Sequence, residues 1–160
     1  MTQNKRQLKI SELYAAHPPK FFDWNGKRPS IEDTGKGDLL CFENCGGRLF
    51  RSNEDSVRKA VDKFVNDYTT GCRRSEEDPA HVYTEVYNFN DLYQLLGILP
   101  TTFGEAFGYT TSEDYVQNVR FRVEFIYPSK NFIAEQFGEP ILLIEPADDE
   151  SYPQYYYKEV

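Results

Sequence analysis

The sequence predicts an α+β fold, in which a small mixed or antiparallel sheet carries two or more packed helices. Two observations predict this class. One long segment repeats apolar residues at helical spacing, and several short segments have strand character. The sequence shows no internal repeat of useful period. Aromatic residues make up 16% of the 160 residues, which favours a packed core over disorder.

The first third of the chain predicts short elements joined by turns. Ser11 is a suitable N-cap for a short helix near the start. Asn25 and Gly26 are typical of the tight turn of a β-hairpin. Residues 39–42 form an apolar run that predicts a strand, and Gly46 with Gly47 predicts a turn after it.

The clearest helix covers about residues 53–68. Its apolar residues share one face, at the spacing of an α-helix: Val57, Val61, Phe64, Val65 and Tyr68. Ser52 and Asp55 resemble a capping box at its start, and Gly71 predicts its end. We expect the apolar face to dock on the sheet.

A second, shorter helix is expected over residues 91–96, with Asn90 as its cap and Gly97 closing it. Gly104 and Gly108 follow in an aromatic segment, where they permit tight backbone turns. This segment lacks the Lys and Ser/Thr of a phosphate-binding loop.

The second half also contains three predicted strands, at residues 81–89, 115–127 and 140–144. In the second of these the apolar side chains alternate with polar ones and point one way: Val119, Phe121, Val123 and Phe125. The third is a continuous apolar run, which predicts a buried strand.

We expect one domain over residues 1–160, with a polar N-terminal segment and an acidic, Tyr-rich C-terminal end. The net charge is -8, and residues 81–160 hold four Lys and Arg against thirteen Asp and Glu. This balance argues against nonspecific nucleic-acid binding. No stretch approaches the roughly 20 apolar residues of a membrane span. Residues 1–10 lack the apolar core of a signal peptide, so we expect a cytoplasmic protein, although a virion component would look the same.

The three cysteines, Cys41, Cys45 and Cys72, cannot all pair within the chain, which favours free thiols in a reducing compartment. Together with His81 they form only an incomplete zinc template. Neither His17 nor His81 lies in a nucleophile motif. The sequence therefore predicts no metal, no cofactor and no catalytic residue.

The acidic end provides the candidate protein-binding residues, which are Asp148, Asp149, Glu150, Tyr155 and Tyr157. Carboxylates imitate the charge of phosphate, and Tyr supplies contact area with a polar tip. Such a surface suits a basic nucleic-acid-binding host protein as partner. The alternative is a tail with solvated acids and Tyr side chains packed in an edge strand.

The second half of the chain resembles small uncharacterised proteins of Gram-positive phages and integrated mobile elements. The likeness is carried by five segments in order, at residues 91–97, 103–109, 119–125, 138–144 and 152–157. It implies a phage or mobile-element origin and no particular activity.

These observations lead to three functional hypotheses. The first is a noncatalytic phage or mobile-element protein that binds and modulates a host protein, with no direct contact to nucleic acid or membrane. The second is a virion structural or assembly protein. The third is a hydrolase whose carboxylate site the sequence does not reveal, because acid–base catalysis depends on geometry and shifted pKa values.

Overall fold

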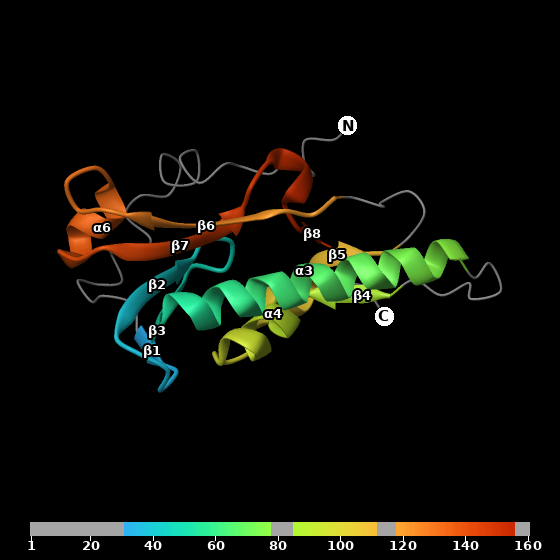
Figure 1. Ribbon diagram of the computed structural model, residues 1–160, viewed down its shortest axis with the longest axis horizontal. Helices are drawn as coiled ribbons and strands as arrows, with labels where there is room; N and C mark the ends of the chain where they lie inside the picture. The colour runs from blue at the N-terminus through green and yellow to red at the C-terminus, as the bar shows by residue number, and fades with distance from the viewer. Residues whose placement is uncertain (1–30, 78–84, 112–117, 156–160) are drawn as a thin grey trace.

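The computed structural model describes residues 31–77, 85–111 and 118–155. Within them, five strands form a mixed sheet in the order β1-β3-β2-β7-β6, and three form a second sheet in the order β4-β5-β8. The long helix α3 passes in front of both sheets (Figure 1). The predicted α+β class, with a mixed sheet and packed helices, is confirmed.

The strands of the five-stranded sheet are β1 (Ile31–Asp33), β3 (Arg48–Ser52), β2 (Leu39–Glu43), β7 (Ile141–Pro146) and β6 (Phe121–Ile126). Those of the second sheet are β4 (Val86–Asn88), β5 (Phe107–Thr110) and β8 (Gln154–Tyr155). The helices are α3 (Glu54–Glu77), α4 (Phe89–Leu96), α5 (Thr102–Ala106), α6 (Phe132–Phe137) and the short 3₁₀ helix η3 (Asp149–Ser151). The pairs β1–β3 and β2–β7 are parallel, and the other strand pairs are antiparallel.

The predicted strand at residues 39–42 is β2, and the turn at Gly46 and Gly47 joins it to β3 in a hairpin. The predicted strand at residues 140–144 is β7, which is buried along its whole length. It lies between β2 and β6, and this central position explains the continuous apolar run. The helix capped by Ser11 and the turn at Asn25 and Gly26 lie outside the described residues.

Helix α3 is longer than predicted, and the expected stop at Gly71 is wrong. Gly71 lies inside the helix, where a Cβ atom would come within 2.6 Å of the Tyr87 hydroxyl oxygen from β4. The glycine therefore allows a strand side chain to approach the helix closely. The predicted cap is also wrong, because Ser52 ends β3 and the Asn53 side chain accepts a hydrogen bond from the Ser56 N–H at 2.8 Å.

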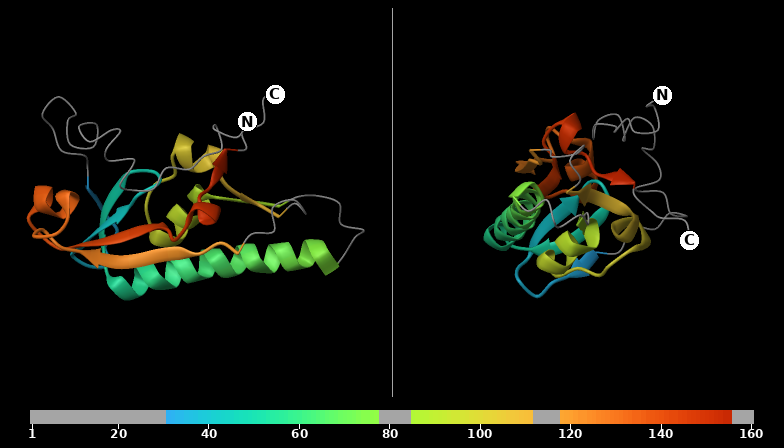
Figure 2. Two further views of the ribbon diagram at one scale, coloured as in Figure 1. Left: turned by 90° about the horizontal axis from the view of Figure 1, so that it is seen from above. Right: turned by 90° about the vertical axis from the view of Figure 1, so that its right-hand side faces the viewer.

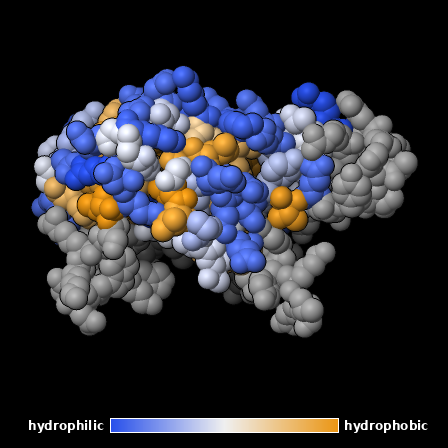
Figure 3. Space-filling model, turned by 90° about the horizontal axis from the view of Figure 1, so that it is seen from below, coloured by the Kyte–Doolittle hydropathy of each residue, from blue (hydrophilic) through white to orange (hydrophobic). Residues whose placement is uncertain are grey.

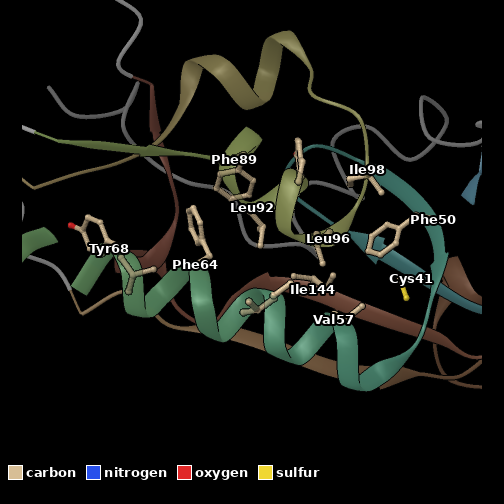
Figure 4. Packing of buried hydrophobic residues seen from close by; sticks show 14 of the residues in the cluster. Cys41, Phe50, Val57, Phe64, Tyr68, Phe89, Leu92, Leu96, Ile98 and Ile144 are labelled. Carbon is tan, nitrogen blue, oxygen red and sulfur yellow. The ribbon is translucent and has the colours of Figure 1, made fainter. Parts of the chain in front are cut away.

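The apolar face of α3 is confirmed, and Figure 2 shows this helix running along one side of the molecule. Val57, Phe64 and Tyr68 are buried in a cluster that also takes residues from α4 and both sheets. Figure 4 shows Phe64 pointing from α3 toward Phe89 and Leu92 of α4. This cluster is the core between the helices and one face of the five-stranded sheet.

The opposite face of the same sheet is covered by α6. A second buried cluster consists of Leu40, Phe42, Leu49, Ile133, Ala134, Ile141 and Leu143. Alternate residues of β2 and β7 contribute to the two clusters, as the two-residue period of a strand requires. The central strands β2 and β7 are therefore buried on both faces.

The cap of α4 differs from the prediction. Asn88 is the N-cap and forms a capping box with Asp91, whereas Asn90 lies within the helix and binds the backbone of Thr101. Gly97 closes α4 with a φ of 86°, as predicted.

The aromatic segment after α4 is not the pair of tight turns that we expected. Residues 102–106 form helix α5, and the following residues form β5. A Cβ atom on Gly108 would lie 2.3 Å from the Tyr87 carbonyl oxygen. This glycine thus permits β5 to approach β4, since it has no side chain to hold the strands apart.

The predicted strand at residues 115–127 overlaps β6, with residues 115–117 outside the described part. Its predicted apolar side faces the α3 cluster, which Val119, Phe121, Val123 and Phe125 all contact. Strand β4 covers only part of the predicted strand at residues 81–89. In the part of the chain that the structure describes, none of the helices combines the length and apolarity needed to cross a membrane.

Candidate functional site

The acidic segment after β7 is anchored to the end of the molecule where β6 begins. The Tyr109 hydroxyl of β5 donates a hydrogen bond to the Ser151 carbonyl oxygen at 2.6 Å. The Ser151 hydroxyl oxygen accepts a second one from the Arg120 N–H at 2.9 Å. Ser151 and Tyr152 are buried. These contacts tie η3 to β5 and to the residue before β6, so its backbone has a defined position.

Asp148 is a structural residue of this segment. Its side chain accepts a hydrogen bond from the Ser151 N–H at 2.9 Å, and it forms an ion pair with Arg120. The hydrogen bond to Ser151 and the nearby guanidinium of Arg120 lower the pKa of Asp148. The expectation that this acid is merely solvated is therefore wrong.

The other four candidate residues are placed differently. Asp149 and Glu150 are exposed on η3. Tyr155 lies in β8, where its backbone is opposite Phe107 of β5. Tyr157 lies outside the described residues. The structure thus places Asp148, Asp149 and Glu150 on one capped turn.

Replacing Asp148 and Asp149 separately tests whether Asp148 stabilises the fold as a cap while Asp149 does not. We expect Asp148→Ala to lower the free energy of unfolding by about 0.5–2 kcal/mol, the usual cost of losing an N-cap side chain. We expect Asp149→Ala to change it by less than about 0.5 kcal/mol, because exposed charges contribute little to stability. Urea unfolding of the two variants measures the difference. Equal effects would mean that the Asp148 cap does not stabilise the fold.

A buried polar network that the sequence analysis missed lies at the end of β2. The Glu43 carboxylate accepts hydrogen bonds from the Tyr93 hydroxyl at 2.5 Å and from the Gly46 N–H at 2.9 Å. It also accepts one from the Cys45 N–H at 2.5 Å. Glu43 is completely buried, and burial raises its pKa to about 7. Its only sequence signal is an acid at the end of an apolar strand.

This network joins three parts of the fold. The Arg48 guanidinium lies over the Tyr93 ring at 4.7 Å and forms an ion pair with Glu32 of β1. The other Glu32 carboxylate oxygen accepts a hydrogen bond from the Leu99 N–H at 2.9 Å. The β2–β3 hairpin, α4 and β1 are therefore held together by these groups.

A second buried carboxylate lies at the end of β7. Glu145 is opposite Arg122 of β6, and the two side chains form an ion pair. Burial raises the pKa of Glu145, while Arg122 acts in the opposite direction. Only 1% of the Glu145 side chain is exposed, whereas 45% of the Arg122 side chain is exposed. This ion pair links the two strands on the sheet face that carries α6.

The thiols lie within the fold. Burial raises the pKa of Cys41 to about 12 and that of Cys45 well above its usual value, which keeps both protonated. Among residues 31–77, 85–111 and 118–155, no three His, Cys, Asp or Glu side chains come together to hold a metal ion. His81 of the considered zinc template is not among the described residues.

Comparison with known proteins adds no relative. The chain matches no protein-family model, no curated protein and no solved structure.

Proposed function

We propose that the protein is a noncatalytic binding protein of a phage or mobile element, and that it modulates a basic host protein. The observation that carries this proposal is the exposed pair Asp149 and Glu150 on a capped turn that hydrogen bonds from Tyr109 and Arg120 anchor to the rest of the fold. A fixed turn presents its charges without the ordering cost of a mobile tail. The resemblance of residues 80–157 to phage and mobile-element proteins supplies the biological setting.

The buried carboxylates support a binding role over a hydrolytic one. Glu43 has the raised pKa that suits a general acid. However, it is completely buried, and its oxygens already accept three hydrogen bonds from the protein itself. Glu145 is paired with Arg122 and is also buried. Both carboxylates thus serve as structural groups inside the fold.

The partner surface is expected to be polar and charged. Figure 3 shows the face seen from below, on the other side of the molecule from the segment between β7 and β8, and this face is mainly hydrophilic with hydrophobic residues in separate patches. The chain has a net charge of -8, and Asp149 and Glu150 add to the acidic character of its second half. Complementary charge chiefly accelerates association, and its effect weakens as salt shortens the Debye length.

The test uses the full chain as bait in a Gram-positive host lysate, followed by binding kinetics with the purified captured protein. We expect the partner to be basic. Asp149→Lys with Glu150→Lys should slow association about tenfold at ~0.1 M salt. Asp148 is left unchanged, because its replacement would also disturb the cap. The matched control is Asp62→Lys with Glu135→Lys, which changes the net charge equally at two other exposed positions.

Three outcomes would contradict the proposal. Unchanged association of the Asp149/Glu150 variant at low salt would place the binding surface elsewhere. Equal slowing by the control variant would show that net charge alone matters. Turnover of a substrate by the wild-type protein, lost in Glu43→Gln but not in the surface variants, would favour the hydrolase instead.

A further inference from the structure

The two edges of the five-stranded sheet differ in a way that matters for association. β1 at one edge has three residues, whereas β6 at the other has six and lies along the upper rim of the sheet in Figure 1. Among the described strands, none pairs with the outer side of β6. Its register with β7 runs without a bulge from Phe121 to Ile126, and the strand contains no Pro or Lys. It therefore lacks three of the devices that commonly block edge pairing, which are a bulge, a proline and a lysine.

The backbone groups that β6 presents outward follow from its register. The Ala147 N–H donates a hydrogen bond to the Arg120 carbonyl oxygen at 2.8 Å, so these two residues are a hydrogen-bonded position of the β6–β7 ladder. Such positions alternate along an antiparallel pair. The backbone N–H and C=O of Arg122 and Glu124 thus face β7. Those of Phe121, Val123 and Phe125 face outward.

The side chains of β6 are self-complementary about Val123. The strand reads Phe-Arg-Val-Glu-Phe over residues 121–125. When a second copy is laid antiparallel with Val123 opposite itself, Arg122 lies opposite Glu124 of the other copy, and this occurs twice. Phe121 lies opposite Phe125. A two-fold axis through Val123 therefore matches opposite charges and pairs aromatic residues, as an isologous interface requires.

We propose that β6 is a dimerisation strand, and that its partner is the β6 of a second copy of this chain. In this arrangement Phe121, Val123 and Phe125 form the hydrogen-bonded positions, with about six main-chain hydrogen bonds between the copies. Arg122 and Glu124 occupy the alternate positions, where facing side chains approach most closely. The two five-stranded sheets become one continuous sheet. This interface is separate from the carboxylates on η3.

The exposure of the charged pair suits this partner. The side chains of Arg122 and Glu124 are 45% and 51% exposed, and they lie on the same sheet face. Arg122 uses one nitrogen of its guanidinium for the buried Glu145, which leaves other donors for a second carboxylate. The Glu124 carboxylate lies 3.5 Å from the Arg122 Nε within the chain. Dimerisation would supply Glu124 with a second partner of opposite charge and Arg122 with a third.

Sedimentation velocity of the full chain is the first test. We expect a mass of about twice the 18.7 kDa of the chain, with dissociation on dilution. Glu124→Arg places like charges opposite each other, and Val123→Pro removes an outward N–H; each should shift the mass toward the monomer. Asp62→Arg is the matched charge-reversal control and should remain dimeric. If the wild-type protein is still a monomer at about 1 mM, the proposal is wrong, because a dimer with a dissociation constant below about 1 mM would be detected at that concentration.

Cysteine crosslinking tests the register itself. In the proposed dimer the two copies of residue 123 lie about 5.5 Å apart between their Cα atoms, within disulfide range. Val123→Cys should therefore form a covalent dimer on mild oxidation. Glu124→Cys is the control, because its two copies are offset by about 7 Å along the strands and cannot be bridged. Crosslinking of both variants alike, or a dimer that Glu124→Arg and Val123→Pro leave intact, would show a different interface.

Discussion

Replacing Phe64 by alanine is expected to lower the free energy of unfolding by about 3–5 kcal/mol. Phe64 is 1% exposed and lies where α3 meets the rest of the core. Its ring makes edge-on contacts with Phe89 of α4, Tyr109 of β5 and Phe121 of β6, at centroid distances of 6.0–6.4 Å. Truncation removes contacts to one helix and both sheets, and the rigid surroundings can close the cavity only in part.

Urea unfolding of the wild type and the variant measures this loss. Lys63→Ala is the control in the same helix, because Lys63 is exposed and forms only a surface ion pair with Asp67. We expect this control to cost less than about 0.5 kcal/mol. A loss below about 1 kcal/mol for Phe64→Ala would mean that α3 does not dock through this face.

Replacing Glu43 by glutamine is expected to stabilise the protein above neutral pH. Burial raises the pKa of Glu43 from its ordinary 4.5 to about 7, so the folded protein binds a proton there more tightly than the unfolded chain does. A carboxyl whose pKa is raised by folding contributes its full stability below pH 4.5, and this contribution is lost as the pH rises through 7. The free energy of unfolding of the wild-type protein should therefore fall by about 3 kcal/mol over this range.

Glutamine resembles the protonated carboxyl in shape and hydrogen bonding. Its amide nitrogen can donate to the Tyr93 hydroxyl, while its oxygen accepts from the Cys45 and Gly46 N–H groups, which both contact the same carboxylate oxygen of Glu43. We therefore expect the two proteins to have similar stability near pH 4. Their difference should grow between pH 4.5 and 7 and then remain constant.

Urea unfolding of both proteins from pH 4 to 8.5 provides the measurement, and their difference cancels the titration of all other groups. Glu43→Ala is the second variant. It leaves the Tyr93 hydroxyl and two partly buried N–H groups without their acceptor, so it should destabilise the fold at every pH. A difference between wild type and Glu43→Gln that does not change with pH would mean that Glu43 does not titrate in this range.

Much of the fold could be predicted because the evidence is local. Four predicted features depend only on residues a few positions apart. They are the β2–β3 turn, the apolar face of α3, the Gly97 end of α4 and the alternation along β6. The helix caps were less predictable. Asn88 and Asn53 replace Asn90 and Ser52, because several polar residues at each helix start can serve as the cap.

The candidate site could be predicted only in part. The acidic composition identified Asp148, Asp149 and Glu150. The structure then showed that Asp148 is a cap with an ion pair, whereas the other two side chains are exposed. Asp148 binds Ser151 and Arg120, and the latter is 28 residues away along the chain, so local sequence carries no sign of the ion pair. The glutamate at position 43 was missed for the same reason, since its partner Tyr93 is 50 residues away.

The sequence by itself determined the α+β class, the buried faces of α3, β6 and β7, and the charge of the C-terminal end. These properties follow from residue type and periodicity, which are present in the chain before it folds. Tertiary structure alone decided that α3 continues past Gly71, where Tyr87 packs against the helix, and that β6 occupies an edge of the sheet. It also decided that Glu43 is buried. Each of these depends on contacts between segments that are distant in the sequence. Such neighbours determine how far a helix continues, which strands pair and which side chains lose contact with water.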